Sequence, residues 1–139
     1  RCRAISATAP IASSVNCIVA QRLARKVCLE CREADPEVTT EALVAAGMAE
    51  DLAKKVAPSK GRGCRTCAET GYKGRVALYE VMQLKDELKE FVLNGASALE
   101  LKREAIRLGM KTLRASALSK LAEGTTTLAE VVRVSAADY

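Results

Sequence analysis

Two pairs of cysteines constrain this chain more than any other feature of its sequence. Cys28 and Cys31 form one C-x-x-C pair, Cys64 and Cys67 form a second, and 32 residues separate the two pairs. A C-x-x-C turn directs both sulfurs toward one point, so two such turns complete the tetrahedron of thiolates that suits Zn²⁺. The spacing therefore predicts a metal site that joins two distant parts of the chain.

The absence of histidine narrows the chemistry of these cysteines. The 139 residues include six Cys and no His. A Ser-His-Asp triad, a Cys-His nucleophile pair, an H-E-x-x-H protease helix and a Cys₂His₂ finger are therefore excluded. Four thiolates leave no coordination position open for water, so we predict a structural Zn²⁺. Cys2 and Cys17 fall outside the pattern; we expect no role for Cys2 and a place in the core for Cys17.

Two other interpretations of the cysteines stay open. They are consistent with buried, reduced thiols, or with a dithiol redox protein, although neither pair opens a helix after a hydrophobic strand.

The uncharged segment 4–21 is too polar to span a bilayer and lacks the apolar centre of a signal peptide. We therefore expect a cytoplasmic protein, in which cysteine pairs are metal ligands more often than disulfides.

Basic residues gather around the cysteine pairs in the sequence. A Zn²⁺ held by four thiolates carries a formal charge of −2, which nearby cations offset. A surface that binds phosphate or another anion is the alternative interpretation. The nine residues are Arg22, Arg25, Lys26, Arg32, Lys60, Arg62, Arg65, Lys73 and Arg75.

Composition and length predict one folded domain with an aliphatic core. Hydrophobic residues make up 49% of the chain and charged residues 28%, which is typical of a globular protein. One Phe, three Tyr and no Trp leave Leu, Val, Ile and Ala to form the core, and argue against stacking on single-stranded nucleic acid. The net charge of +5 is a mild bias.

Hydrophobic periodicity divides the chain into three blocks. Val15, Ile18, Val19 and Leu23 recur at helical spacing and predict a helix over 11–27. The block 28–84 holds the cysteine module, with short helices over 41–46 and 49–56 and a strand over 75–84 that follows a glycine-containing turn.

The third block, 85–137, is predicted to be a bundle of short helices. Ser97 and Glu100 form one capping box, and Thr127 and Glu130 form a second. The predicted class is mostly α with a short β component (α+β), a helical subdomain carrying an inserted Cys₄ zinc module.

The chain contains no complete active site of its own. It has neither a G-x-x-x-x-G-K-[ST] loop nor a G-x-G-x-x-G loop, and Gly61-Arg-Gly63 is too short to hold a phosphate. We assign no catalytic residue and no cofactor-binding residue. The chain begins at Arg1 without Met, so we expect a processed product or a fragment.

Several segments together resemble the C-terminal part of secretion ATPases, the hexameric motors of type IV pilus assembly (PilB-like) and type II secretion (GspE-like). The resemblance covers residues 11–137. The matching segments are Ile11-Ala-Ser-Ser-Val-Asn16, Val19-Ala-Gln-Arg-Leu-Ala-Arg25, both C-x-x-C pairs, Gly71-Tyr-x-Gly74-Arg75, Tyr79-Glu80, Gly109-Met-Lys-Thr-Leu113 and Thr127-Leu-Ala-Glu-Val131.

The resemblance implies a parent ATPase in the cytoplasm, docked at the inner membrane, which converts ATP hydrolysis into pilin or pseudopilus assembly. ATP and Mg²⁺ would bind upstream of this chain, which would be one C-terminal subdomain and inactive alone. The implied partners are the other subunits of a homo-hexamer and an inner-membrane platform protein, with no nucleic acid. Residues 1–10 depart from the family pattern, and no arginine-finger role is assigned to Arg22 or Arg75.

Both the pilus motors and the type II secretion motors carry the tetracysteine, whereas the retraction motors of the same superfamily generally lack it. We favour the pilus motor, with type II secretion as the alternative. A free-standing Cys₄ zinc ribbon that binds nucleic acid is a further alternative from another class.

Overall fold

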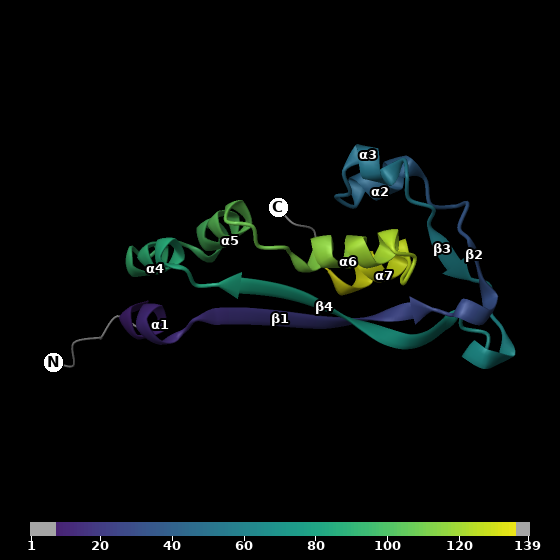
Figure 1. The fold of residues 1–139 in the computed structure, drawn as a ribbon, viewed down its shortest axis with the longest axis horizontal. Helices are drawn as coiled ribbons and strands as arrows, with labels where there is room; N and C mark the ends of the chain where they lie inside the picture. The colour runs from purple at the N-terminus through teal and green to yellow at the C-terminus, as the bar shows by residue number, and fades with distance from the viewer. Residues whose placement is uncertain (1–7, 136–139) are drawn as a thin grey trace. The chain divides into compact units, whose positions relative to one another are not determined.

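A computed structural model describes residues 8–135 (Figure 1), and these residues form two compact units. One unit comprises residues 8–20 and 80–111 of the described chain, and the other comprises 21–79 and 112–135. The elements are α1 (Thr8–Ser14), β1 (Cys17–Val27), η1 (Leu29–Cys31), β2 (Arg32–Ala34), α2 (Thr40–Ala45), α3 (Glu50–Ala53), β3 (Ser59–Gly61), η2 (Arg65–Cys67), β4 (Tyr72–Gln83), α4 (Asp86–Leu93), α5 (Ala98–Arg107), α6 (Leu113–Ala122) and α7 (Leu128–Val134).

The first unit consists of three short helices and the adjoining ends of β1 and β4. Helix α4 contacts both α1 and α5, and the core is centred on Leu84, Leu88 and Ala105. The predicted capping box of α5 is confirmed, because the Ser97 hydroxyl accepts from the Glu100 amide and the Glu100 carboxylate accepts from the Ser97 amide.

The predicted helix over 11–27 is wrong for most of its length. Only its first residues belong to α1, and residues 17–27 form the strand β1. Ile18, Val19 and Leu23, which defined the helical stripe, are each about half exposed, whereas Ala24 and Val27 are buried. The segment contains the β-branched residues Ile18, Val19 and Val27, and pairing with β4 provides backbone partners that the local sequence does not reveal.

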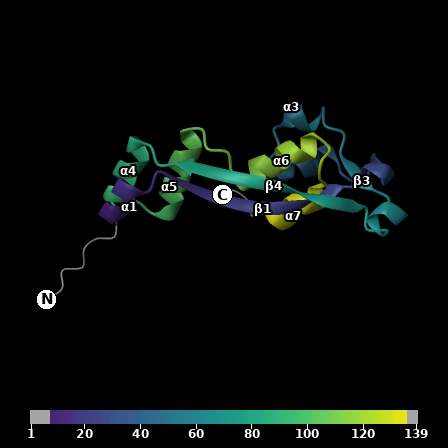
Figure 2. The same cartoon turned by 60° about the horizontal axis from the view of Figure 1, so that its bottom comes forward.

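The strand predicted over 75–84 is confirmed as β4, which is longer than predicted and begins at Tyr72. Strands β1 and β4 form a two-stranded sheet and run side by side in Figures 1 and 2. The α+β class is therefore confirmed, with more strand than the sequence indicated. Cys17 begins β1 and is exposed, so the prediction that it is a core residue is wrong; Cys2 lies outside the described residues.

The second unit has the aliphatic core that the composition predicts. Helices α6 and α7 pack on the portions of β1 and β4 that belong to this unit. The centre of the core is formed by Ala24, Leu43, Leu78, Leu121 and Val131, all at most 1% exposed. The four helices expected over 85–137 are present, but α4 and α5 belong to one unit and α6 and α7 to the other.

None of the described helices is long and apolar enough to cross a membrane. The longest, α5 and α6, have ten residues each, about half of what a bilayer requires.

Candidate metal centre

The cysteine pairs lie in two tight turns of the second unit. Cys28 directly follows β1 and opens the 3₁₀ turn η1, and Cys64 opens the similar turn η2 a few residues before β4. The Cys28 amide donates to the carbonyl oxygen of Gly71, at 2.9 Å, and so connects the first turn to the start of β4.

The 32 residues between the pairs fold back so that the second cysteine turn lies beside the first. After Cys31 the chain forms β2, the short helices α2 and α3, and then β3, which pairs antiparallel with β2. The register places Arg32 opposite Gly61, and the Arg62 amide donates to the carbonyl oxygen of Cys31 at 2.9 Å. This small ladder brings the second cysteine turn beside the first.

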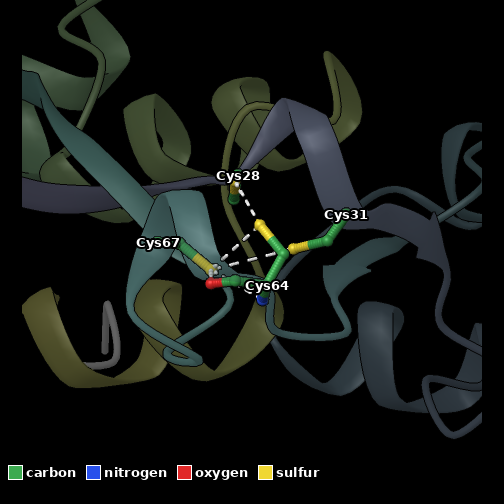
Figure 3. Close-up of side chains that lie close together, drawn as sticks. All are labelled: Cys28, Cys31, Cys64 and Cys67. Atoms are coloured by element: carbon green, nitrogen blue, oxygen red, sulfur yellow. Dashed lines mark hydrogen bonds between the residues drawn. The ribbon is translucent and has the colours of Figure 1, made fainter.

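The four sulfurs converge on one point (Figure 3), and all lie within 4.8 Å of one another. The Sγ–Sγ distance is 3.9 Å for Cys28–Cys64, 3.9 Å for Cys31–Cys67 and 3.7 Å for Cys64–Cys67. A tetrahedral metal with metal–sulfur bonds of about 2.3 Å places its ligand sulfurs about 3.8 Å apart. The four cysteines named from the sequence therefore fit Zn²⁺ in number, chemistry and spacing.

Backbone amides point at two of the sulfurs. The Gly63 amide donates to Cys31 Sγ at 3.3 Å, and the amides of Cys64 and Gly71 donate to Cys67 Sγ at 3.2 and 3.3 Å. Such donors stabilise thiolates and fix the orientation of metal ligands.

The pKa of each thiol depends on the balance between burial, which raises it, and hydrogen bonds from backbone amides, which lower it. Burial raises the pKa of Cys31 to about 12, against the opposing hydrogen bond from Gly63. Burial also acts to raise the pKa of Cys67, but the amides of Cys64 and Gly71 outweigh it and lower that pKa to about 6. A buried cluster of this kind requires a cation to hold four thiolates together, and a divalent metal would supply that charge.

A comparison with known proteins agrees with the motifs around this site. The profile of the family described as Type II/IV secretion system protein matches residues 4–133. The chain belongs to this family. The resemblance to secretion ATPases that the sequence motifs suggested is therefore confirmed.

The relatives of this family member include pilus and secretion proteins. It is 51% identical over 128 residues to the type IV pilus assembly ATPase PilB of Myxococcus xanthus (92% of this chain, 23% of the relative) and 41% identical over 123 residues to that of Thermus thermophilus (88% and 14%). It is 32% identical over 128 residues to the type II secretion system protein E of Aeromonas hydrophila (92% and 25%). The chain thus spans a quarter or less of each of these relatives.

The nine basic residues do not act as one group in this family member. Arg25 pairs with Glu130, Lys60 lies 3.4 Å from Asp35 and 3.8 Å from Glu37, and the Arg32 guanidinium packs against Gly124 just after α6. The six others are exposed: Arg22, Lys26, Arg62, Arg65, Lys73 and Arg75.

An ion-pair network that the sequence did not reveal supports the start of the module. Glu130 of α7 is 1% exposed and accepts from the backbone amide and the guanidinium of Arg25, at 2.7 to 3.0 Å, and from Arg133 at 2.7 and 2.8 Å. The Tyr72 ring lies 4.2 Å from the Arg25 guanidinium, and its hydroxyl hydrogen-bonds that of Thr127. The network connects β1, β4 and α7 close to the cysteine turns.

The second capping box is only half formed, because Glu130 belongs to this ion-pair network. The Thr127 hydroxyl accepts from the Glu130 amide, as predicted, but the Glu130 carboxylate binds the two arginines instead of the Thr127 amide. The motif was a correct signal for the start of α7. It gave no indication of the partner at Arg25, which lies 105 residues away in the sequence.

Gly61 and Gly71 allow the two halves of the centre to approach each other. A Cβ atom on Gly61 would collide with the backbone of Gly71, and one on Gly71 would collide with the carbonyl of Gly61. Gly71 also holds Cys28 through its carbonyl and Cys67 through its amide. Both positions therefore need glycine for the backbone contact itself.

We expect Gly61→Ala to lower Zn²⁺ affinity about 10- to 100-fold, because it displaces the residue that orients two ligands. Competition titration with a chromophoric chelator measures the change. Gly47→Ala is the matched control in the same unit: its Cβ would meet only ordinary contacts at 3.8 Å or more, so its φ of +101° affects stability alone. Equal Zn²⁺ affinities for the two variants would refute the role given to this contact.

Proposed function

We propose that this chain is the zinc-stabilised C-terminal part of a hexameric motor that couples ATP hydrolysis to type IV pilus assembly. The convergence of four cysteine sulfurs at tetrahedral spacing, in a member of this family, carries the proposal. Cys28, Cys31, Cys64 and Cys67 would hold the ion. When bound, Zn²⁺ supplies positive charge that keeps four buried thiolates together.

The chain's own residues would then perform a structural task. The two turns would be clamped to each other, and with them the end of β1 and the start of β4. Four protein ligands leave no open position on the ion, so the centre would bind no substrate. ATP and Mg²⁺ would be bound by other parts of the parent protein, since this sequence has no phosphate-binding loop.

The pilus assignment is supported by the identities of the relatives. Four proteins named type IV pilus assembly ATPase PilB are 40–51% identical to this chain, and three type II secretion proteins are 32–35% identical. A type II secretion motor is the second candidate, because those relatives match over the same length of chain.

The assembly and location follow from the same proposal. The parent would be a homo-hexamer in the cytoplasm, peripheral to the inner membrane and in contact with an inner-membrane platform protein. We expect no nucleic-acid partner. A free-standing zinc ribbon for nucleic acid would instead bind DNA or RNA with an affinity that falls steeply with salt.

A chimera tests the function. In Myxococcus xanthus PilB, the matching segment is replaced by this chain, and surface pili are measured in a strain that lacks PilB. We expect pili with the chimera, none when it also carries Cys28→Ser and Cys31→Ser, and unchanged pili with Cys17→Ser, a cysteine outside the cluster. A chimera that accumulates normally but assembles no pili contradicts the pilus assignment, especially if the equivalent chimera of Aeromonas hydrophila protein E restores secretion.

Metal analysis of the purified chain tests the centre separately. We expect about one tightly held Zn²⁺ per chain and no ATP hydrolysis. Protein that is folded, and contains no metal after purification in the presence of zinc, would refute the zinc proposal and leave the family membership intact.

A further inference from the structure

The four cysteines differ in their exposure to solvent. Cys28 is fully buried, and Cys31 and Cys67 are each 6% exposed, whereas Cys64 is only partly buried. A bound metal keeps its cysteine ligands as thiolates, which are the form that reacts with oxidants and electrophiles. Of the four ligands, Cys64 is therefore the residue most open to a reagent that arrives from solvent.

The surroundings of Cys64 favour such a reaction. Arg62 and Arg65 flank it in the same loop and both are exposed, while the Glu69 carboxylate lies beside Gly63, so two cations face one anion here. Reactive cysteines are typically found in partly exposed, electropositive surroundings, which stabilise a thiolate and an anionic leaving group. The adjacent Gly63 contributes no side chain that would cover the sulfur.

The sulfur of Cys67 lies next to that of Cys64 and can form a disulfide with it. Cys67 Sγ lies 3.7 Å away, closer than the 3.9 Å of the Cys31–Cys67 pair, and both residues belong to the turn at η2. Cys28 Sγ lies 3.9 Å from Cys64 but belongs to the other turn. A bond between Cys64 and Cys67 closes within one turn and leaves the other cysteine pair untouched.

From this geometry we infer that Cys64 is the site at which hydroperoxides open the metal centre, with Cys67 as the resolving thiolate. The inference rests on the proposed zinc centre and extends it to a redox-sensitive one. Oxidation would remove two of the four ligands from one side and so release the clamp between the two turns. Reduction by a thiol and resupply of zinc would restore it.

The chemistry balances with hydrogen peroxide as the oxidant. The Cys64 thiolate attacks one peroxide oxygen, the O–O bond breaks, and hydroxide leaves, which gives a sulfenic acid on Cys64. The Cys67 thiolate then attacks the Cys64 sulfur; the S–S bond forms, the S–O bond breaks, and a second hydroxide leaves. Two thiolates lose two electrons in total, and one peroxide becomes two hydroxide ions.

Tryptic mapping can identify the oxidised cysteines. The zinc-loaded chain with Cys2→Ser and Cys17→Ser is treated with substoichiometric peroxide, the remaining thiols are alkylated after denaturation, and the protein is digested. Cleavage after Arg62, Arg65 and Lys73 separates Cys64 from Cys67, while Cys28 and Cys31 stay together in residues 27–32. We expect a linked pair of the peptides 63–65 and 66–73, formed at the rate at which a chromophoric chelator detects free zinc.

A ligand replacement gives an independent measurement. Cys64→His keeps four zinc ligands, as in natural Cys₃His sites, but removes the sulfur of the least buried ligand, so peroxide should release zinc about tenfold more slowly. Release at the parent's rate from a variant that holds its zinc would overturn the inference. Peptide mapping that finds Cys28 or Cys31 oxidised first would also overturn the inference. If Cys64→His fails to bind zinc, the peptide mapping of the parent decides between the two outcomes. A parent preparation without zinc contradicts the proposed centre itself, whereas loaded protein oxidised elsewhere contradicts only the assignment to Cys64.

Discussion

Removing the metal should lower the unfolding free energy of the second unit by about 4 kcal/mol or more, and its thermal midpoint by roughly 15–25 °C. The reason is that Zn²⁺ would add four bonds across two turns that the protein otherwise joins through backbone hydrogen bonds and the short β2–β3 ladder. Metal-free thiols would also leave four sulfurs packed together in a buried cluster without the charge that binds them. Tyrosine fluorescence is a suitable signal because Tyr72 and Tyr79 both belong to this unit.

The experiment compares the zinc-loaded chain with and without a strong chelator, and with Cys28→Ala. We expect the variant to unfold near the midpoint of the chelated parent and to respond little to chelator. Cys17→Ala is the matched control: it removes an exposed cysteine outside the cluster and should change stability by no more than about 0.5 kcal/mol. A chelated parent that keeps its midpoint would show that the centre does not stabilise the fold.

Glu130→Gln should cost about 3 kcal/mol at pH 7, the second largest effect we expect. Hydrogen bonds from Arg133, opposed by burial and reinforced by Arg25, lower the pKa of Glu130 from 4.5 to about 2. The folded state thus favours the ionised carboxylate, and glutamine removes the charge that both arginines bind. Urea denaturation of parent and variant measures the difference. Glu123→Gln, at an exposed pair with Lys120, should cost less than about 1 kcal/mol.

The pH dependence of this effect has a definite sign. Because the folded pKa is depressed, the contribution of Glu130 is fully present above its unfolded pKa of 4.5 and declines as pH falls toward 2. The stability difference between parent and Glu130→Gln should therefore be constant from pH 8 to about 6 and smaller by about 1 kcal/mol at pH 4. A difference that grows on acidification would mean that Glu130 is not ionised in the folded protein.

Much of the local structure could be predicted because its causes are local. The cap at Ser97, the start of α7 at Thr127 and the strand over 75–84 all depend on neighbouring residues. The four candidate ligands belong to the same class, since a C-x-x-C turn brings two sulfurs together wherever it occurs.

The errors concern residues whose conformation depends on distant partners. Residues 17–27 carry an apolar pattern that fits a helix, but they become a strand because β4, more than 40 residues later, offers a row of backbone hydrogen-bonding groups. Cys17 was expected in the core for the same reason and is exposed instead. Glu130 belongs to a recognisable capping motif, yet its carboxylate forms ion pairs with Arg25 and Arg133.

Residue identity and spacing along the chain were sufficient to name the four cysteines that can form a metal centre and the family to which the chain is related. Three features appear only once the chain is folded: the two pairs meet, Gly61 and Gly71 touch where they do so, and Cys64 is the least buried of the four. Convergence, backbone contact and solvent access depend on how the 32 intervening residues fold back through β2 and β3. No local pattern specifies that return path, since its energy comes from pairing and packing between residues far apart in the sequence.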